Sequence, residues 1–183
     1  MKIATWDLES TSLRSDQGFL LCCGIKELGK KGRIVGLRDN VIPKDRMQID
    51  RNLVHTLKHE LEEFDVWITW NGKMFDVPML NGRLRINGLQ PLQPRFHIDA
   101  MWMAPKLGLT SRKLDWVARA LGAPVEKTPL DLRTWKYAET EAIKGLKDHA
   151  CYDDIVHHCK MDLEVTEFVY EQLKPMIRTI QRC

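Results

Sequence analysis

The alternation of hydrophobic and polar positions predicts that the chain opens with strands. Three segments rich in apolar and β-branched residues, separated by short polar turns, have the length and composition of β-strands, at residues 2–8, 18–28 and 31–39. The turn between the second and third contains Gly29 and Gly32, which favours a hairpin. Strands joined by such short connections indicate an antiparallel arrangement in this part of the chain.

Helical periodicity begins near residue 50. Leu53, Leu57, Leu61 and Phe64 recur every three or four residues, which predicts an amphipathic helix over about 50–64. Further segments follow, with strands predicted at 65–70 and 95–101 and helices at 77–88, from Ser111 to Gly122, around 139–147 and from about 152 to 173. Consecutive strands followed by interleaved helices and strands favour an α/β or α+β layer fold with a mixed sheet.

The composition narrows the class of protein further. A chain of 183 residues predicts one domain, over residues 1–183, and 44% hydrophobic and 29% charged residues are ordinary for a globular protein in solution. The net charge of +3 does not oppose a polyanionic partner. Five cysteines without a C-x-x-C pair indicate free thiols in a reducing cytosol, so we expect a cytoplasmic protein. No apolar run approaches the roughly 20 residues that span a bilayer, so no membrane partner is expected.

The first candidate for chemistry is a pair of carboxylates at the end of the first predicted strand. Asp7 and Glu9 are two positions apart, so strand alternation places them on one face, roughly 6–7 Å apart. At an effective dielectric constant of about 20, their repulsion costs about 2–3 kcal/mol. Hydration of both groups or a cation between them would offset this cost, and a D-x-E pair also arises by chance in a chain of this composition.

The second candidate is Asp76, in the segment TWNGKMFDVPML at residues 69–80. It follows a predicted buried strand and a turn at Asn71-Gly72, and it precedes a helix that Val77-Pro78 opens. Aspartate in this position is typical of a helix N-cap, whereas strand ends are also where α/β folds place their functional sites. This segment alone leaves both interpretations open.

The third candidate lies in the last predicted helix, where Asp162 stands among apolar neighbours. His158 is four residues earlier and shares its face of the helix, whereas His157 lies about 140° around the axis. A surface His–Asp pair, worth a few tenths of a kcal/mol, is the structural alternative.

The three candidates together form a constellation that suits metal-ion chemistry. Four carboxylates carry up to four negative charges, which two divalent cations would balance, and hard oxygen ligands suit Mg²⁺ or Mn²⁺. Two such ions about 3.5–4 Å apart stabilise both the attacking and the leaving oxygen of phosphodiester hydrolysis. A neighbouring histidine is able to accept the proton of the attacking water.

The same segments carry a resemblance to a known family. WDLES at 6–10 resembles the first motif of the DEDD 3′–5′ exonucleases, WNGKMFDVPML at 70–80 their second, and HHCKMDLEVT at 157–166 their third. The second motif is most similar to the proofreading domains of family-B DNA polymerases, and residues 96–122 resemble the region between the second and third motifs. The resemblance implies an α/β ribonuclease-H-like fold, with a mixed sheet whose first three strands are antiparallel and whose later strands are parallel, flanked by helices.

The resemblance also implies roles for the candidate residues. Asp7, Glu9, Asp76 and Asp162 would bind two Mg²⁺ or Mn²⁺ ions and act in catalysis.

The family's general base is either a tyrosine four residues before the last aspartate or a histidine five before it; this chain has His158 and His157 at those positions. Helical geometry favours His158, because Ile155 and Cys159 place the start of the helix upstream, and His157 is the alternative if the helix begins there.

Substrate contacts follow from the same resemblance. Ser10, Thr11 and Leu13 come directly after the first acidic pair, where the family's loop touches the terminal nucleotide. Asn71 is a candidate for a hydrogen bond to a sugar or phosphate, and Phe75 for stacking on a base, with core packing as its alternative.

Other polar residues carry weaker expectations. Lys73 is a candidate for a phosphate contact, whereas Arg83 and Arg85 are expected on a solvated helix face. Asp99 follows a short predicted strand and is expected to make a structural hydrogen bond.

The function expected from the resemblance is that of a stand-alone 3′–5′ exonuclease, of the kind that phages and bacteria carry, acting on single-stranded or frayed nucleic acid. Its substrates would be 3′ ends of single-stranded DNA or RNA, with DNA favoured, and it would either act alone or serve a DNA polymerase in trans. Two alternatives stay open: an endonuclease or junction resolvase with the same fold and metals, and a non-catalytic nucleic-acid-binding module on a degenerate nuclease fold.

Overall fold

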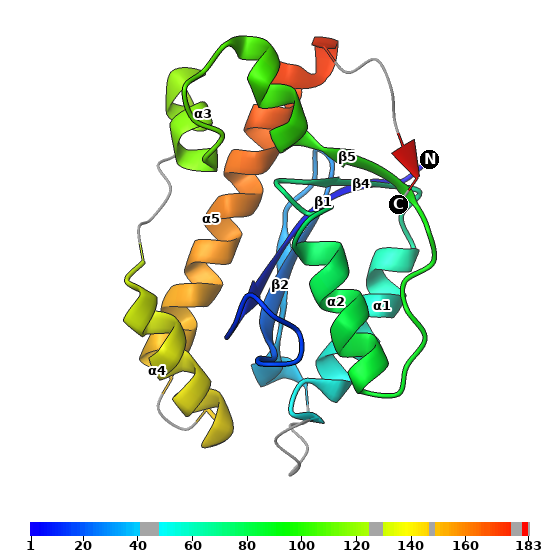
Figure 1. Cartoon of the computed structure of the whole chain (residues 1–183), viewed down its shortest axis with the longest axis vertical. Coiled ribbons are helices and arrows are strands. Elements are labelled where there is room, and N and C mark those ends of the chain that lie inside the picture. The colour runs from blue at the N-terminus through cyan, green and yellow to red at the C-terminus, as the bar shows by residue number, and fades with distance from the viewer. Residues whose placement is uncertain (41–47, 125–129, 147–148, 177–180, 183) are drawn as a thin grey trace.

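The protein is built on a mixed β-sheet with helices on both faces (Figure 1). The computed structural model describes residues 1–40, 48–124, 130–146, 149–176 and 181–182. The sheet has six strands in the order β3-β2-β1-β4-β5-β6. Their bounds are Ile3–Ser10 for β1, Leu20–Glu27 for β2, Arg33–Gly36 for β3, Val66–Thr69 for β4, Phe96–Asp99 for β5 and Gln181–Arg182 for β6.

The strand directions confirm the predicted fold class. β1, β2 and β3 form an antiparallel meander, whereas β4 pairs with β1, and β5 with β4, in parallel. Each parallel connection passes through a helix, as such connections require. β6 adds a short antiparallel edge strand to β5 that the sequence pattern did not predict.

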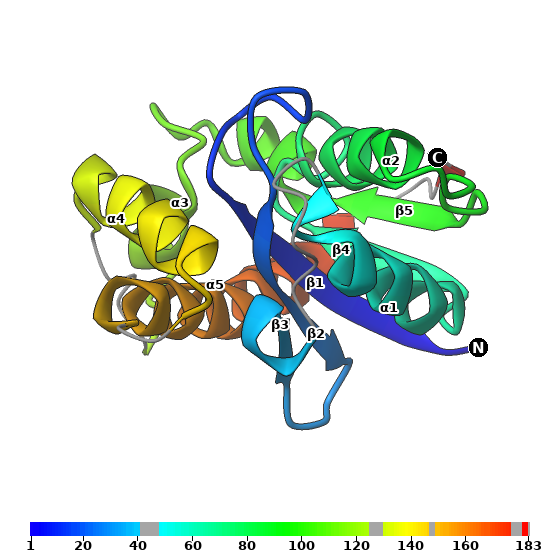
Figure 2. The same cartoon turned by 90° about the horizontal axis from the view of Figure 1, so that it is seen from below.

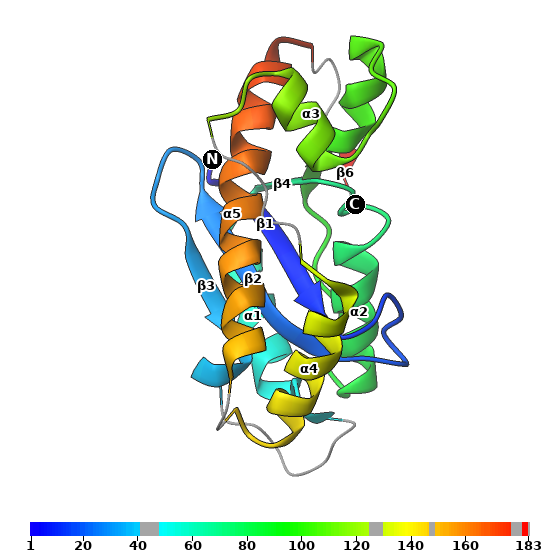
Figure 3. The ribbon, with the colours of Figure 1, turned by 90° about the vertical axis from the view of Figure 1, so that its left-hand side faces the viewer.

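The helices form two layers. α1 (Arg51–Glu62) and α2 (Asp76–Ile86) lie on one face of the sheet, and the long α5 (Ala150–Leu173) crosses the other (Figure 1). Figure 2 shows α3 (Leu114–Ala120) and α4 (Leu132–Ile143) on the side of the molecule where α5 lies. Both of them pack against α5, and Figure 3 shows α4 beside the end of β1. No helix in the described ranges is both long and apolar enough to cross a membrane.

Buried tryptophans in the core hold β1, β4 and α1 together. Trp6 of β1 and Trp67 of β4 are fully buried and meet edge to face with ring centroids 5.8 Å apart. The indole N–H of Trp67 donates to the carbonyl of Leu61 at 3.0 Å, which ties the end of α1 to the sheet.

Cys22, Cys23, Cys151 and Cys159 are free thiols, as predicted, and Cys183 lies outside the described residues.

Two element predictions differ from the structure. The helix predicted around 139–147 is α4, which begins earlier because Asp131 caps it by accepting from the backbone N–H of Arg133 at 2.9 Å. Ser111 is not the N-cap of α3: that position is Lys113, whose backbone N–H donates to the Ser111 hydroxyl at 3.2 Å. An eight-residue 3-10 helix at Ala100–Leu107, η3, was not predicted.

A buried histidine in β5 gives the fold a specific pH dependence. His97 is 1% exposed, and one ring nitrogen lies 2.7 Å from the Thr69 hydroxyl. Burial, with a smaller contribution from the charge of Lys73, lowers the pKa of His97 from 6.5 to about 4. Because the folded-state pKa is the lower one, this group's contribution to stability is complete above pH 6.5 and is lost as the pH falls towards 4.

We therefore expect His97→Gln to flatten the pH dependence of unfolding. Relative to pH 7, the wild type loses about 3 kcal/mol more than the variant by pH 4, which corresponds to the pKa difference at 1.36 kcal/mol per unit. Urea unfolding at pH 4, 5, 6 and 7 measures the difference, with the exposed His55→Gln as the matched control. Parallel stability curves for the wild type and His97→Gln would contradict this assignment.

Candidate functional site

A cavity of about 950 Å³ opens where the ends of β1 and β4 face α5. Its walls come from β1, α2, η3, α3, α4 and α5 and from the segments that precede α2, α3 and α4. The four predicted carboxylates all line it, namely Asp7, Glu9, Asp76 and Asp162. Residues separated by more than 150 positions in the sequence are thus brought to one cavity by the parallel strand order and by the path of α5 across the sheet.

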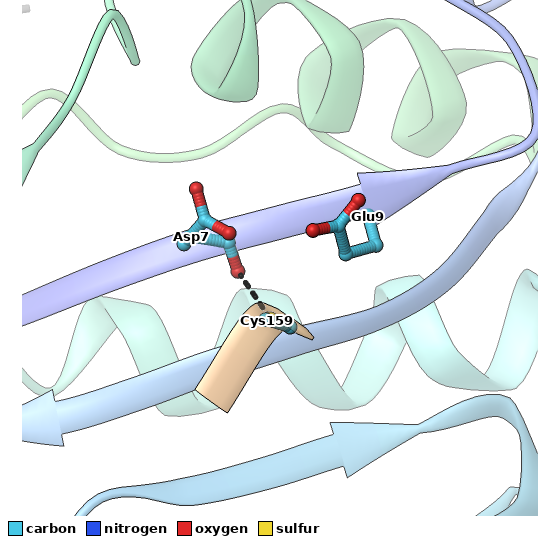
Figure 4. Close-up of side chains that lie close together, drawn as sticks. All are labelled: Asp7, Glu9 and Cys159. Atoms are coloured by element: carbon cyan, nitrogen blue, oxygen red, sulfur yellow. Dashed lines mark hydrogen bonds between the residues drawn. The ribbon is translucent and has the colours of Figure 1, made fainter. Parts of the chain in front are cut away.

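The first pair of carboxylates follows directly from strand geometry. Asp7 and Glu9 point to the same face of β1, opposite Gly24 and Cys22 of β2 in the strand register (Figure 4). One side-chain oxygen of each lies within 4.8 Å of the other and of the Cys159 sulfur. The β1–β2 register shifts between Glu9 and Ser10, so the regular strand pairing ends immediately after the acidic pair.

Cys159 completes this group of potential metal ligands, but it suits a hard metal ion less well than the two carboxylates do. Its Sγ donates to the carbonyl oxygen of Asp7 at 3.6 Å. The hydrogen bond to Cys22, followed by burial, raises the pKa of the Cys159 thiol well above its usual value. Because the thiolate is the form that binds a metal ion, the raised pKa makes Cys159 a less favourable ligand than the two carboxylates.

The Asp76 side chain is held in the site by a hydrogen bond to β1, and it does not cap a helix. It is the first residue of α2, the N-cap position is Phe75, and no side chain caps this helix, so the N-cap interpretation is wrong. The Asp76 carboxylate instead accepts from the backbone N–H of Leu8 at 3.0 Å. Burial first, and then the negative charge of Asp7, raise the pKa of Asp76 well above its usual value.

α5 supplies the remaining predicted groups and separates the two histidines. The helix runs unbroken from Ala150, so it does not begin at His157. His158 and Asp162 are each 5% exposed and line the cavity, and His158 Nε2 lies 3.7 Å from Asp162 Oδ2. His157 is exposed and does not line the cavity.

A glycine in the sheet brings α5 this close. A side-chain carbon at Gly24 of β2 would lie 2.6 Å from Leu163 Cδ1, a distance that real atoms do not adopt. Leu163 directly follows Asp162 in α5, so the absence of a side chain at Gly24 leaves room for the Leu163 side chain to pack on the sheet.

The predicted substrate residues divide into two groups. Asn71 and Phe75 line the cavity, whereas Ser10, Thr11 and Leu13 do not. The Ser10 hydroxyl donates to the carbonyl of Ser12 at 2.7 Å and the Thr11 hydroxyl accepts from the N–H of Phe19 at 3.1 Å, so both support the loop between β1 and β2. Leu13 is 81% exposed in that loop.

The turn that carries Asn71 is held by Asp99. Asn71 has a left-handed backbone, with φ at 67°, a conformation that asparagine adopts more readily than most residues. The Asp99 carboxylate accepts from the backbone N–H groups of Asn71, Lys73 and Met101 at 2.9, 3.0 and 3.2 Å. The structural hydrogen bond expected of Asp99 is thereby confirmed.

Several residues that line the cavity were missed from the sequence. They are aromatic or basic and belong to α4, to α3 and its flanks or to the end of β4: Trp70, Arg112, Lys113, Arg119 and Trp135. Trp135 had a usable signal, because Trp135, Ala138 and Ala142 recur at helical spacing and the two alanines are buried. The basic residues had no signal in the sequence beyond their charge.

Comparisons with known proteins agree with the fold. The profile of the RNase_H superfamily matches residues 5–174. The structure of the family B DNA polymerase from the hyperthermophilic archaeon Pyrobaculum calidifontis superimposes with a TM-score of 0.73 at 16% sequence identity, which shows a shared fold. The match covers 96% of this chain and 25% of that one, so the chain spans about a quarter of the polymerase's length. No curated protein matches.

Proposed function

This chain belongs to the RNase H superfamily, and on that premise we propose that it is a metal-dependent 3′–5′ exonuclease that acts on single-stranded or frayed nucleic acid, with DNA preferred over RNA. Membership of the superfamily suggests nuclease activity. The observation that carries the finer proposal is the convergence of four carboxylates and one histidine, from β1, α2 and α5, on one cavity.

The donor set fits divalent metal ions. Asp7, Glu9, Asp76 and Asp162 offer only hard oxygen ligands, which suit Mg²⁺ or Mn²⁺. The raised pKa of Asp76 shows that burial next to Asp7 makes a second negative charge unfavourable, and a cation between the two would remove that cost. When bound to these four residues, two such ions stabilise the attacking and leaving oxygens of phosphodiester hydrolysis.

The chain's own groups complete the proposed reaction. The imidazole of His158 accepts a proton from the attacking water, whose oxygen forms a bond to phosphorus while the bond from phosphorus to the 3′-oxygen of the preceding nucleotide breaks. The products are a nucleoside 5′-monophosphate and a strand shortened by one residue, whose 3′-oxygen takes a proton from solvent.

Other residues of the cavity suit a nucleic-acid strand. Phe75 and Trp70 offer aromatic surface for stacking on bases, which is worth about 1–3 kcal/mol per base and tolerates any sequence. Arg112, Lys113 and Arg119 offer positive charge to the phosphates of the strand. We propose these, together with Asn71, as the substrate-binding residues.

The test is degradation of 5′-labelled single-stranded DNA, duplex DNA and single-stranded RNA, with Mg²⁺, with Mn²⁺ and with EDTA. We expect a ladder that shortens from the 3′ end, fastest on single-stranded DNA, and no products with EDTA. Internal products would instead support an endonuclease or resolvase, and tight binding without cleavage would support a non-catalytic binding module.

The two adjacent histidines provide a matched pair for the same assay. We expect His158→Ala to lower kcat by about 10²–10⁴-fold, the range for loss of a general base, and His157→Ala to retain wild-type kcat because His157 is exposed outside the cavity. A larger loss in His157→Ala than in His158→Ala would contradict the assignment.

A further inference from the structure

Trp135 of α4 contacts two of the proposed catalytic groups at once. Its side chain is half-buried and lines the cavity. The indole N–H donates to Glu9 Oε2, with the nitrogen and oxygen 3.3 Å apart. The indole ring also stands edge-on to the imidazole of His158, with centroids 5.8 Å apart and an interplanar angle of 89°. Glu9 and His158 come from different elements, β1 and α5.

The chemistry of the indole group suits both of these contacts. Its nitrogen is a donor only, so the bond to Glu9 satisfies a carboxylate oxygen and presents no competing acceptor. Holding Oε2 restricts the rotation of the Glu9 carboxylate. Perpendicular aromatic packing likewise restricts the plane of the His158 ring.

Such restriction has a functional consequence. A metal-binding carboxylate and a proton acceptor work only when each is held within about 0.5 Å of its productive position, and groups outside the ligand set usually provide that support. Glutamate has three rotatable side-chain bonds, so Glu9 benefits from such support more than the aspartates do.

We propose that Trp135 is a positioning residue, which holds the carboxylate of Glu9 and the imidazole of His158 in a fixed relation so that α4 sets the geometry between the metal-binding and proton-accepting groups. The proposal rests on the proposed nuclease function. A packing role alone is the competing explanation, because Trp135 shares its helix face with the buried Ala138 and Ala142.

The test compares Trp135→Phe with Trp135→Leu. Trp135→Phe keeps an aromatic ring beside His158 but has no N–H for Glu9, whereas Trp135→Leu has neither. Mn²⁺ affinity is measured on the free protein by calorimetry, and kcat and KM are measured on single-stranded DNA. Thermal unfolding of each metal-free variant reports packing separately.

We expect Trp135→Phe to bind Mn²⁺ about 10-fold more weakly and to lose kcat by about 10-fold, the lower end of the range for such supporting groups, with KM within about twofold of the wild type. Trp135→Leu should lose a further several-fold in kcat at the same Mn²⁺ affinity as Trp135→Phe. The control, Trp116→Phe, alters a tryptophan of α3 that is 49% exposed and does not line the cavity, and should match the wild type.

The outcomes separate this inference from the proposed function. If the wild type binds Mn²⁺ and degrades DNA while Trp135→Phe equals it in both, or differs from it only in thermal stability, the positioning role is wrong and the nuclease proposal stands. If the wild type neither binds Mn²⁺ nor degrades DNA, both are overturned.

Discussion

Asp76→Asn is expected to lower phosphodiester hydrolysis on the order of a thousandfold, and yet to leave the metal-free protein at least as stable as the wild type. The loss of activity is expected if Asp76 is a metal ligand as proposed, because loss of a ligand would remove several kcal/mol of transition-state charge stabilisation, and about 4 kcal/mol corresponds to a thousandfold. The retained stability follows because the wild-type carboxylate is 2% exposed and lies close enough to Asp7 for that charge to raise its pKa.

The asparagine preserves what the carboxylate does for the fold. Its side-chain oxygen is still able to accept from the backbone N–H of Leu8, which is the hydrogen bond that joins α2 to β1. What is removed is an ionisable group whose charged form is made unfavourable by burial and by Asp7, so its loss costs the folded protein no electrostatic stabilisation. A residue kept for folding alone would show the opposite result, a loss of stability on substitution.

The nuclease assay on single-stranded DNA measures the loss of hydrolysis, and urea unfolding with and without Mn²⁺ measures stability and metal binding. Because a ligand that binds only the folded state stabilises it by RT ln(1 + [L]/Kd), saturating Mn²⁺ at about 100 times Kd should add about 2.7 kcal/mol to the wild type and much less to Asp76→Asn. Asp16→Asn, an exposed position in the loop between β1 and β2, is the control and should respond as the wild type does. Equal metal stabilisation of Asp76→Asn and the wild type would show that Asp76 is not a ligand.

The parts of the site that the sequence predicted are those that local geometry determines. The two-residue period of a strand was sufficient to place Asp7 and Glu9 on one face, and the helical period was sufficient to place His158 beside Asp162. The order of strands and helices was sufficient to predict a mixed sheet, because parallel neighbours require helical crossovers.

The parts that were missed depend on contacts between distant segments. Trp135 reaches Glu9 across 126 positions, so this contact was not available in advance, although the spacing of Trp135, Ala138 and Ala142 indicates the helix that carries it. Ser10 and Thr11 were expected at the substrate because they follow Glu9 in sequence, but their hydroxyls bond within the loop instead. Sequence proximity to a ligand does not determine which way a loop turns.

Arg83 shows the same limit most clearly, because the expectation of a solvated helix face is wrong. Its side chain is 3% exposed and that of Asp50 is fully buried. The guanidinium donates from Nε to Asp50 Oδ2 at 2.9 Å and from Nη2 to Asp50 Oδ1 at 2.8 Å. Asp50 also accepts from the backbone N–H of Leu20 at 2.9 Å and from the side-chain amide of Asn87 at 3.0 Å. This network ties α2 to β2 and to the start of α1.

We expect Arg83→Met to destabilise the protein by about 3–5 kcal/mol, because removing one partner leaves the other charge buried without compensation. The matched control is Arg85→Met, an exposed position on the same helix that should change stability by no more than about 0.5 kcal/mol. Urea midpoints at constant m-value measure both, and equal effects of the two substitutions would contradict the buried-pair assignment.

The double variant Asp50→Asn/Arg83→Met separates the cost of an unpaired charge from the value of the pair. We expect it to be more stable than Arg83→Met, because the neutral amide still offers an oxygen to the N–H of Leu20 and leaves no buried charge. The double variant should still lack the hydrogen bond that Arg83 Nη1 donates to the carbonyl oxygen of Ser15 at 2.9 Å. This bond holds the loop after β1. If the double variant regains stability but has a raised KM for single-stranded DNA, the loop after β1 contributes to substrate binding. If its stability is regained and its KM equals that of the wild type, the role of Arg83 is confined to folding.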